Sequence, residues 1–438
     1  VGGYLRLSYR RRLGRPWRIG AIAGLSLAFL SLSGWGALAY PNLVWLTALT
    51  PTVLLAMLLV ITFDRRVALL VAAGQAILVG AELGLGVGFV ATVLVGALLA
   101  GWRLRDVRNR NDMVWGGIVV SAGLMLAVAT VGLVERAWPW EVLGEIGIDS
   151  VWAGVGAFMA TAITLIMLPW VERVFGVVTG MTLSELRDPK QPLLRKLQQS
   201  APGTYNHSLN VATLAEGAAD AIGADGLHAY VGALYHDIGK MNKPDYFVEN
   251  QPRGFNRHDK LSPAMSLLVI VGHVKDGMEL AREYGLPRSL HHYIESHHGT
   301  TLVEYFYDQA KRQADADDSI DRPAEIEYRY PGPRPRAKEA AILMLCDAVE
   351  SATRAMAEPT PSRIQQLVHA LARKRLMDGQ FDESNLTLRE LSVIEEALTK
   401  SLCAIYHGRI AYPKSAEAKD AEEEMAATAD RVAAEQGA

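Results

Sequence analysis

The chain has 438 residues, enough for two or three domains, and its formal net charge is −3. This weak overall charge argues against a general binder of nucleic-acid polymers. The two cysteines, Cys346 and Cys403, are too few for a disulfide framework or a thiolate zinc site. Such sparse cysteine use fits a reducing, cytoplasmic location for the second half of the chain, where both cysteines lie.

Six apolar segments fill the first half, and each is long enough to cross a bilayer, which needs about 20 residues. They are 19–40, 43–63, 67–83, 86–102, 113–134 and 151–171. Six such segments in succession, without amphipathic periodicity, argue against core helices of a soluble protein. The third and fourth predict a helical hairpin that is closed by a tight glycine-rich turn at Gly84.

The loops between these segments predict their orientation, because short loops rich in Lys and Arg stay in the cytoplasm. Basic residues gather in 10–18, 64–66 and 103–110, whereas the loop expected at 135–150 is acidic and carries tryptophans. Six crossings that begin inside also end inside, so the second half is expected in the cytoplasm. Glu82 is expected at an outer turn, in water.

Five parts follow from these patterns. The second half shows apolar residues at three- and four-residue spacing and no strand alternation, so the fold class is all-α: a polytopic membrane bundle followed by a cytoplasmic α-helical domain. The parts are a basic segment 1–18, a bundle of six transmembrane helices 19–178, a linker 179–200, a soluble domain 201–412 and a charged tail 413–438, predicted to be disordered.

All eleven histidines follow residue 200, so the chemistry of histidine belongs to the soluble domain. His236-Asp237, in GALYHDIGK, has an ordinary explanation as a helix end. Asp347 in ILMLCDAV should face a cation or several donors, because burying an unpaired carboxylate costs several kcal/mol. Five imidazoles and two carboxylates near helix ends would suit two divalent metals that share a bridging carboxylate, which is a hydrolytic arrangement.

Long motifs support this interpretation: APGTYNHSLNVA, VGALYHDIGK, KPDYFVENQ, NRHDKLSPAMS, HVKDGMELA, HHGT and RYPGPRPRAKEAAILMLCDAVESATR. In order and spacing they resemble the seven-transmembrane HD-domain family, of the cyclic di-AMP phosphodiesterase (PgpH) type. The resemblance implies an HD phosphohydrolase on a multi-pass anchor in the bacterial inner membrane. It also implies two divalent transition metals, manganese or iron, bridged by Asp237. The implied ligands are His207, His236, Asp237, His273, His297, His298 and Asp347.

The activity that the resemblance implies is hydrolysis of cyclic di-AMP to pApA by metal-activated hydroxide attack on phosphorus. Two alternatives stay open: a phosphohydrolase of cyclic di-GMP or another nucleotide, and a membrane receptor that binds nucleotide without cleaving it. Transport ranks last, because the helices lack paired charges. The expected partners are a cyclic dinucleotide and membrane lipid, with no nucleic-acid polymer, and homo-oligomerisation stays open.

Two cations are further catalytic candidates. Lys240 follows the HDIG turn, and Arg354 lies two helical turns after Asp347, so either side chain could balance the charge of a phosphate. Surface solvation is the alternative for both. Tyr246 and Phe247 offer stacking faces for adenine, although aromatic residues after a turn are commonly core.

The remaining histidines are expected to play lesser roles. His291-His292 compete with the pair at 297–298, but Gly299, which ends the helix, favours the second pair. His258 lies on a polar loop that can face substrate. Solvent or packing roles are expected for the three others, His228, His369 and His407.

Two departures from the family pattern concern the start of the chain and one side chain. The family carries an extracellular domain and one more crossing before this point, and residues 1–9 look like the last turns of such a helix. The sequence is therefore expected to be a fragment with a further crossing upstream. Asn206 stands where many members have another polar residue, often histidine, which should not affect the metals.

Overall fold

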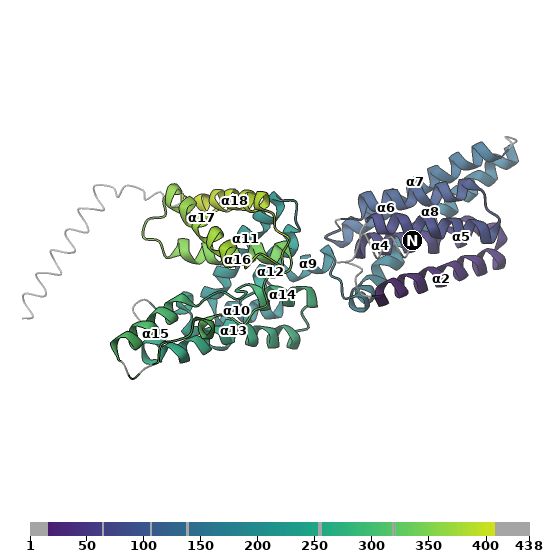
Figure 1. The fold of residues 1–438 in the computed structure, drawn as a ribbon. Helices are drawn as coiled ribbons and strands as arrows, with labels where there is room; N and C mark the ends of the chain where they lie inside the picture. The colour runs from purple at the N-terminus through teal and green to yellow at the C-terminus, as the bar shows by residue number, and fades with distance from the viewer. Residues whose placement is uncertain are drawn as a thin grey trace, which may run out of the picture.

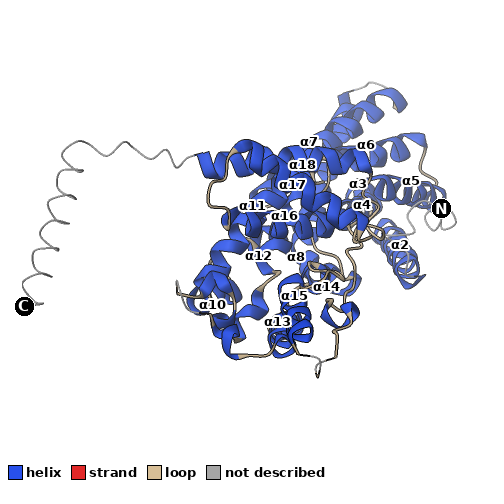
Figure 2. Cartoon of the chain, turned by 60° about the vertical axis from the view of Figure 1, so that its left-hand side comes forward, coloured by secondary structure: helices blue, strands red, loops and turns tan. Residues whose placement is uncertain are grey.

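The computed structural model describes residues 16–63, 65–105, 107–136, 140–252, 256–317, 319 and 321–407. Most of the predicted basic segment and all of the predicted disordered tail lie outside these residues. Within them all regular structure is helical, apart from one isolated bridge between Leu302 and Arg329. The predicted all-α fold is therefore confirmed, as Figure 2 shows.

Six helical segments run side by side in the first half and follow the six predicted spans (Figure 1). They are α2 (Pro16–Ala39), a second span made of η1 (Pro41–Leu43), α3 (Val44–Thr47) and α4 (Leu49–Thr62), α5 (Arg65–Leu83), α6 (Val87–Arg103), α7 (Arg110–Glu135) and α8 (Trp140–Phe175). Five are long and apolar enough to cross a membrane, whereas α6 is shorter, with 17 residues. The chain is therefore a multi-pass membrane protein.

The centre of this bundle is α4, whose residues from Thr52 to Val60 are buried without a break. Small residues let its neighbours approach closely, since Gly117 of α7 faces the side chain of Thr161 on α8. Helices α5 and α6 form the predicted hairpin at Gly84, and Glu82 at the end of α5 is exposed, as expected.

Helix α8 corrects the expected loop at 135–150, because it begins at Trp140 and continues for 36 residues. At about 1.5 Å per residue this length exceeds the hydrocarbon core of about 30 Å. The acidic stretch stays helical because it packs against the end of α7: Ile146 lies against Gly132, and Arg136 pairs with Asp149 at 2.8 Å.

The predicted linker contains two short helices, α9 (Gly180–Leu186) and α10 (Pro192–Ser200). It leaves the bundle at the end of α8, where the ring of Phe175 stacks on Trp17 and meets Phe63 edge-on. Gly180 lies against the backbone of Val107. The described ends of the basic loops thus gather at the end of the bundle that leads to the second domain (Figure 1).

Among its described residues, the second domain has eight α-helices packed around one main hydrophobic core. They are α11 (Pro202–Ala221), α12 (Gly226–Tyr235), α13 (Pro263–Glu283), α14 (Arg288–Ser296), α15 (Glu304–Ala316), α16 (Lys338–Arg354), α17 (Pro361–Met377) and α18 (Leu388–His407), with short 3-10 turns η2 (Ile238–Asn242), η3 (Pro244–Tyr246), η4 (Val248–Asn250), η5 (Arg257–Lys260) and η6 (Glu325–Tyr328). The first part of helix α16 lies deep in this core, since residues 340–347 are all buried. It crosses α11 and α12 and so presents Asp347 to both.

Candidate metal centre

The HDIG turn is where the centre is assembled. Helix α12 ends at Tyr235, so His236 and Asp237 do occupy a helix end, immediately before η2. The backbone of α13 crosses the turn so closely that a Cβ on Gly239 would collide with the carbonyl of His273. Glycine therefore lets the turn lie against α13, and this contact brings Asp237 beside His273.

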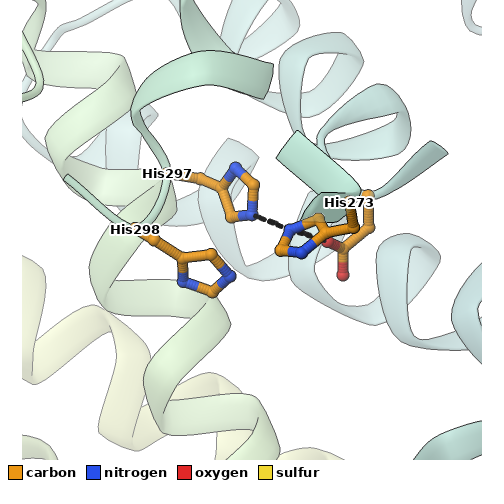
Figure 3. A group of neighbouring side chains, drawn as sticks. His273, His297 and His298 are labelled. Atoms are coloured by element: carbon orange, nitrogen blue, oxygen red, sulfur yellow. Dashed lines mark hydrogen bonds and ion pairs between the residues drawn. The ribbon is translucent and has the colours of Figure 1, made fainter. Parts of the chain in front are cut away.

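The structure brings all seven predicted ligand residues together, from α11, the end of α12, α13, the end of α14 and α16. They form two groups of four that share Asp237, and the donor atoms of each group lie within 4.8 Å of one another. The first group is His207, His236, Asp237 and Asp347; the second is Asp237, His273, His297 and His298. Figure 3 shows the three histidines of the second group converging.

Asp237 directs one oxygen toward each group. Its Oδ2 lies 3.2 Å from Nε2 of His236 and 3.7 Å from Nε2 of His207. Its Oδ1 lies 3.3 Å from Nε2 of His273 and 3.5 Å from Nε2 of His297. The carboxylate thus stands between two sets of imidazole nitrogens.

Three of the imidazoles, those of His236, His273 and His297, have the same tautomer. Their Nδ1 atoms donate to the backbone carbonyls of Ala233, Ile270 and Ile294, at 2.6, 2.5 and 2.9 Å. Because a carbonyl only accepts, Nδ1 carries the proton and Nε2 presents a lone pair to the centre of the site.

These lone pairs fit a cation. Nε2 of His273 lies 3.2 Å from Nε2 of His297, and two acceptors at this distance repel each other unless a proton or a cation lies between them (Figure 3). Nε2 of His236 and Oδ1 of Asp237 are buried and make no hydrogen bond. Buried polar atoms are normally satisfied, so the residues present suit metal ions.

The electrostatics of the site keep its carboxylates ionised. Burial alone would raise the pKa of Asp237, but its interactions with His236 and with the ammonium of Lys240 lower it well below its usual value. Burial lowers the pKa of His273 to about 3 and that of His298 well below its usual value, so both rings are neutral. His207 differs: burial lowers its pKa, yet hydrogen bonds to two carboxylates outweigh burial and raise the pKa to about 9.

Lys240 lies in this cluster. Its Nζ is 2.7 Å from Oδ2 of Asp237 and 2.9 Å from Oε1 of Glu249. Burial disfavours the charged amine, but the charges of these two carboxylates raise the pKa of Lys240, which stays protonated. Sequence analysis missed Glu249, whose motif carries no spacing signal that points to the HD turn.

Arg354 reaches the cluster only through Glu350. Its Nη1 lies 3.6 Å from Oε2 of Glu350, and the same oxygen lies 2.6 Å from Nδ1 of His207. The side chain of a helical residue points back toward the preceding turn, so Arg354 meets the residue four positions earlier. Glu350 was missed, although its position three residues after Asp347, on the same face of a buried helix, was a usable signal.

The centre is most accessible beside His298 and Asp347, whose side chains are 22% and 12% exposed, against at most 1% for the other five. Tyr330, which sequence analysis also missed, stacks on the ring of His298 at 4.2 Å. Phe247 is buried edge-on against His273, so it serves as core and not as an open stacking face.

The other histidines lie outside the two groups. His258 is a correction: it is buried and bonded to the carbonyl of Tyr246 at 2.8 Å, so it packs inside its loop. His291 contacts the carbonyl of Leu286, and His292 contacts Glu295, which leaves the pair at 297–298 to converge, as expected. The ring of His228 contacts Tyr293, and the ring of His369 contacts Glu395. The side chain of His407 lies outside the described residues.

Two family profiles match the chain in succession. The one described as a 7TM receptor with intracellular HD hydrolase matches residues 3–179, and the HD domain matches residues 204–352. The chain belongs to the seven-transmembrane HD-domain family.

Relatives of this seven-transmembrane HD-domain protein carry a functional name. The cyclic-di-AMP phosphodiesterase PgpH of Bacillus subtilis is 40% identical over 332 residues, which cover 76% of this chain and 45% of that protein. The protein of the same name from Listeria monocytogenes is 39% identical over 326 residues, which cover 74% of this chain and 44% of that protein. The chain thus spans a little less than half the length of these curated relatives.

One solved structure that resembles the chain is the HD domain of the L. monocytogenes phosphodiesterase PgpH in complex with cyclic-di-AMP. It is 44% identical, and the match covers 50% of this chain and all of that one, with a TM-score of 0.48.

Proposed function

We propose that this protein is a membrane-anchored, metal-dependent phosphodiesterase that hydrolyses the second messenger cyclic di-AMP to pApA. The observation that carries the proposal is the position of Asp237, whose two oxygens face two separate sets of imidazole nitrogens. The names of the two relatives that are 40% and 39% identical support the choice of substrate.

In this proposal the seven residues hold two divalent transition metals, manganese or iron. The first metal would be held by His207, His236, Asp237 and Asp347, and the second by Asp237, His273, His297 and His298. When bound, two such cations lower the pKa of water and polarise phosphate oxygens. Mixed imidazole and carboxylate ligands suit both manganese and iron.

The side chains around the ligands have roles of their own. Lys240 holds Oδ2 of Asp237 at 2.7 Å and so fixes the orientation of the bridging carboxylate. The phosphodiester would approach beside His298 and Asp347, the two most exposed ligands, while the others exclude water. Tyr330 stacks on His298 and holds the imidazole in place at this edge. Arg354, which contacts Glu350, would tune the site from behind His207 and would not bind substrate.

We place the HD domain in the cytoplasm and the helices in the bacterial inner membrane. The predicted cytoplasmic loops lie at the end of the bundle that leads to the linker, so the proposed orientation is consistent with the fold. Membrane lipid would contact the exposed apolar side chains of the bundle, such as those of Trp35, Trp102 and Ile166. Homo-oligomerisation stays a prediction.

The test uses the full chain in detergent, analysed for bound metal and offered a panel of cyclic dinucleotides with manganese or iron. We expect two metals per chain and conversion of cyclic di-AMP to pApA. Preferential cleavage of cyclic di-GMP would support the alternative phosphohydrolase. Tight binding of cyclic di-AMP without cleavage, in protein that holds both metals, would identify a receptor.

A further inference from the structure

His207 is held differently from the other buried imidazoles of the metal centre. His236, His273 and His297 each donate their Nδ1 proton to a neutral backbone carbonyl of their own turn. Nδ1 of His207 instead lies 2.6 Å from Oε2 of Glu350, which comes from another helix and is 2% exposed. A carboxylate behind an imidazole makes the ring a stronger donor to a metal than a carbonyl does.

Glu350 is itself fixed in place by its neighbours. Asn210, one turn after His207 on α11, donates to Oε1 at 3.3 Å. Arg354 approaches Oε2 at 3.6 Å from the solvent side. Asp347, on the same face of α16, contacts the opposite nitrogen of His207, Nε2, at 3.0 Å. Helix α16 therefore holds both ring nitrogens of His207 between two carboxylates.

This arrangement makes the two groups of ligands electrostatically unequal. The group that contains His207 has the shared Asp237, a carboxylate of its own in Asp347, and Glu350 directly behind it. The other group has the shared Asp237 and three imidazoles, two of which donate their Nδ1 proton to neutral backbone carbonyls. A divalent cation is more strongly stabilised where more negative charge surrounds it in a buried site.

We propose that Glu350 is a positioning residue that makes the metal position beside His207 the tighter of the two. It does so by fixing the Nδ1–H tautomer of His207, aiming Nε2 into the site and adding negative charge behind the ring. The inference rests on the proposed two-metal function, which it deepens by ordering the two positions.

The test is equilibrium dialysis of the full chain against Mn²⁺ alone, with bound metal measured across the titration. The variant Glu350→Gln keeps the shape and a hydrogen-bond acceptor but removes the charge. We expect it to weaken the tighter position by about 10–100-fold and to leave the second position unchanged. The matched control is Glu395→Gln, which alters a Glu–His contact of 2.9 Å outside both ligand groups and should titrate as wild type does.

A second variant separates charge from packing. Arg354→Gln removes the cation beside Glu350, so the tighter position should hold Mn²⁺ at least as strongly as in wild type. The inference is overturned if Glu350→Gln titrates as wild type does, if it weakens both positions equally, or if Arg354→Gln weakens binding as much as Glu350→Gln. Fewer than two equivalents of Mn²⁺ in saturated wild type would contradict the proposed function instead.

Discussion

The membrane bundle satisfies most of its buried hydroxyls within single helices, whereas the HD domain pairs its buried charged groups across the fold. In the bundle, the hydroxyls of Thr52, Thr92 and Thr164 donate to the carbonyl four residues earlier in the same helix, at 2.8–3.0 Å. In the HD domain, His207 contacts carboxylates that lie 140 and 143 residues away in sequence. These threonines are thus satisfied by local structure, whereas His207 and its carboxylate partners depend on the whole fold. Ser33 and Gln75 are the exceptions among the described buried polar residues of the bundle, because they donate to the carbonyls of Ala48 and Ser26 on neighbouring segments.

Charge follows the same division. Within the described part of the bundle, the buried polar residues are Ser, Thr and Gln, and none carries a charge. The HD domain buries Asp237, Asp347 and Glu350 together with several histidines. Buried charges are costly unless they are paired or bind metals, so function is concentrated in the second region.

Asp237→Ala should have the largest effect on activity and metal content, which the contrast assigns to the HD domain, because it removes the only residue that both ligand groups share. We expect it to abolish cyclic di-AMP hydrolysis and to reduce bound metal, while the helical content largely persists. The fold survives because the buried amine of Lys240 keeps Glu249 as a partner at 2.9 Å. Measurements of turnover, metal content and far-UV circular dichroism would check this.

The control for Asp237→Ala is His369→Ala, which truncates an exposed histidine outside both groups and should leave turnover within a few-fold of wild type. Near-normal hydrolysis by Asp237→Ala with unchanged metal content would show that the HD pair is only a helix end.

Single introduced cysteines should report on which side of the membrane each end of the bundle lies. Gly144 lies on the exposed start of α8, and Asn111 lies at the opposite, basic end, beside the cap that Asn109 provides for α7. In intact cells we expect an impermeant thiol reagent to label Gly144→Cys, and to label Asn111→Cys only after permeabilisation. Replacing the partly exposed Cys403 with serine supplies the background, since Cys346 is buried. Equal labelling of both positions would contradict the proposed orientation.

Thr164→Val should have a small effect, because the hydroxyl of Thr164 bonds only within its own helix at 2.8 Å. We expect a loss of less than about 1 kcal/mol in the free energy of unfolding, measured by denaturing-detergent titration. The contrasting variant is Gly117→Val, whose new side chain would collide with Thr161 and should destabilise the bundle much more. A large loss of unfolding free energy in Thr164→Val would contradict the view that this buried hydroxyl is satisfied by a hydrogen bond within its own helix.

Glu390→Gln should have the smallest effect, since it concerns an ion pair at the surface of the HD domain. The hydrogen bond from Lys338, with help from the backbone of Thr387, lowers the pKa of Glu390 to about 2. Because the folded pKa lies below the unfolded value, the stabilisation is present above about pH 4.5 and is lost as pH falls toward 2. Solvent screening limits it to about 0.5 kcal/mol. Wild type and variant should therefore differ slightly in thermal stability at pH 7 and converge only as the pH falls to about 2; a constant difference would contradict this.

Sequence analysis succeeded where a local property decides the structure. The six apolar runs become six helical segments because apolar side chains avoid water and a helix satisfies its backbone groups internally. It failed at 135–150, where composition suggested a loop but packing of Ile146 on Gly132 extends α8.

By itself the sequence determined the all-α class and predicted the division between an apolar helical half and a half that carries all the histidines, together with the seven candidate ligands, which stand in recognisable motifs. Only the tertiary structure decided that the ligands form two groups around Asp237, that Lys240 pairs with Glu249, and that Glu350 lies behind His207. The physical reason is distance along the chain. Contacts between residues 140 positions apart arise when α11 packs on α16, and no local pattern of polarity records which side chains that packing brings together.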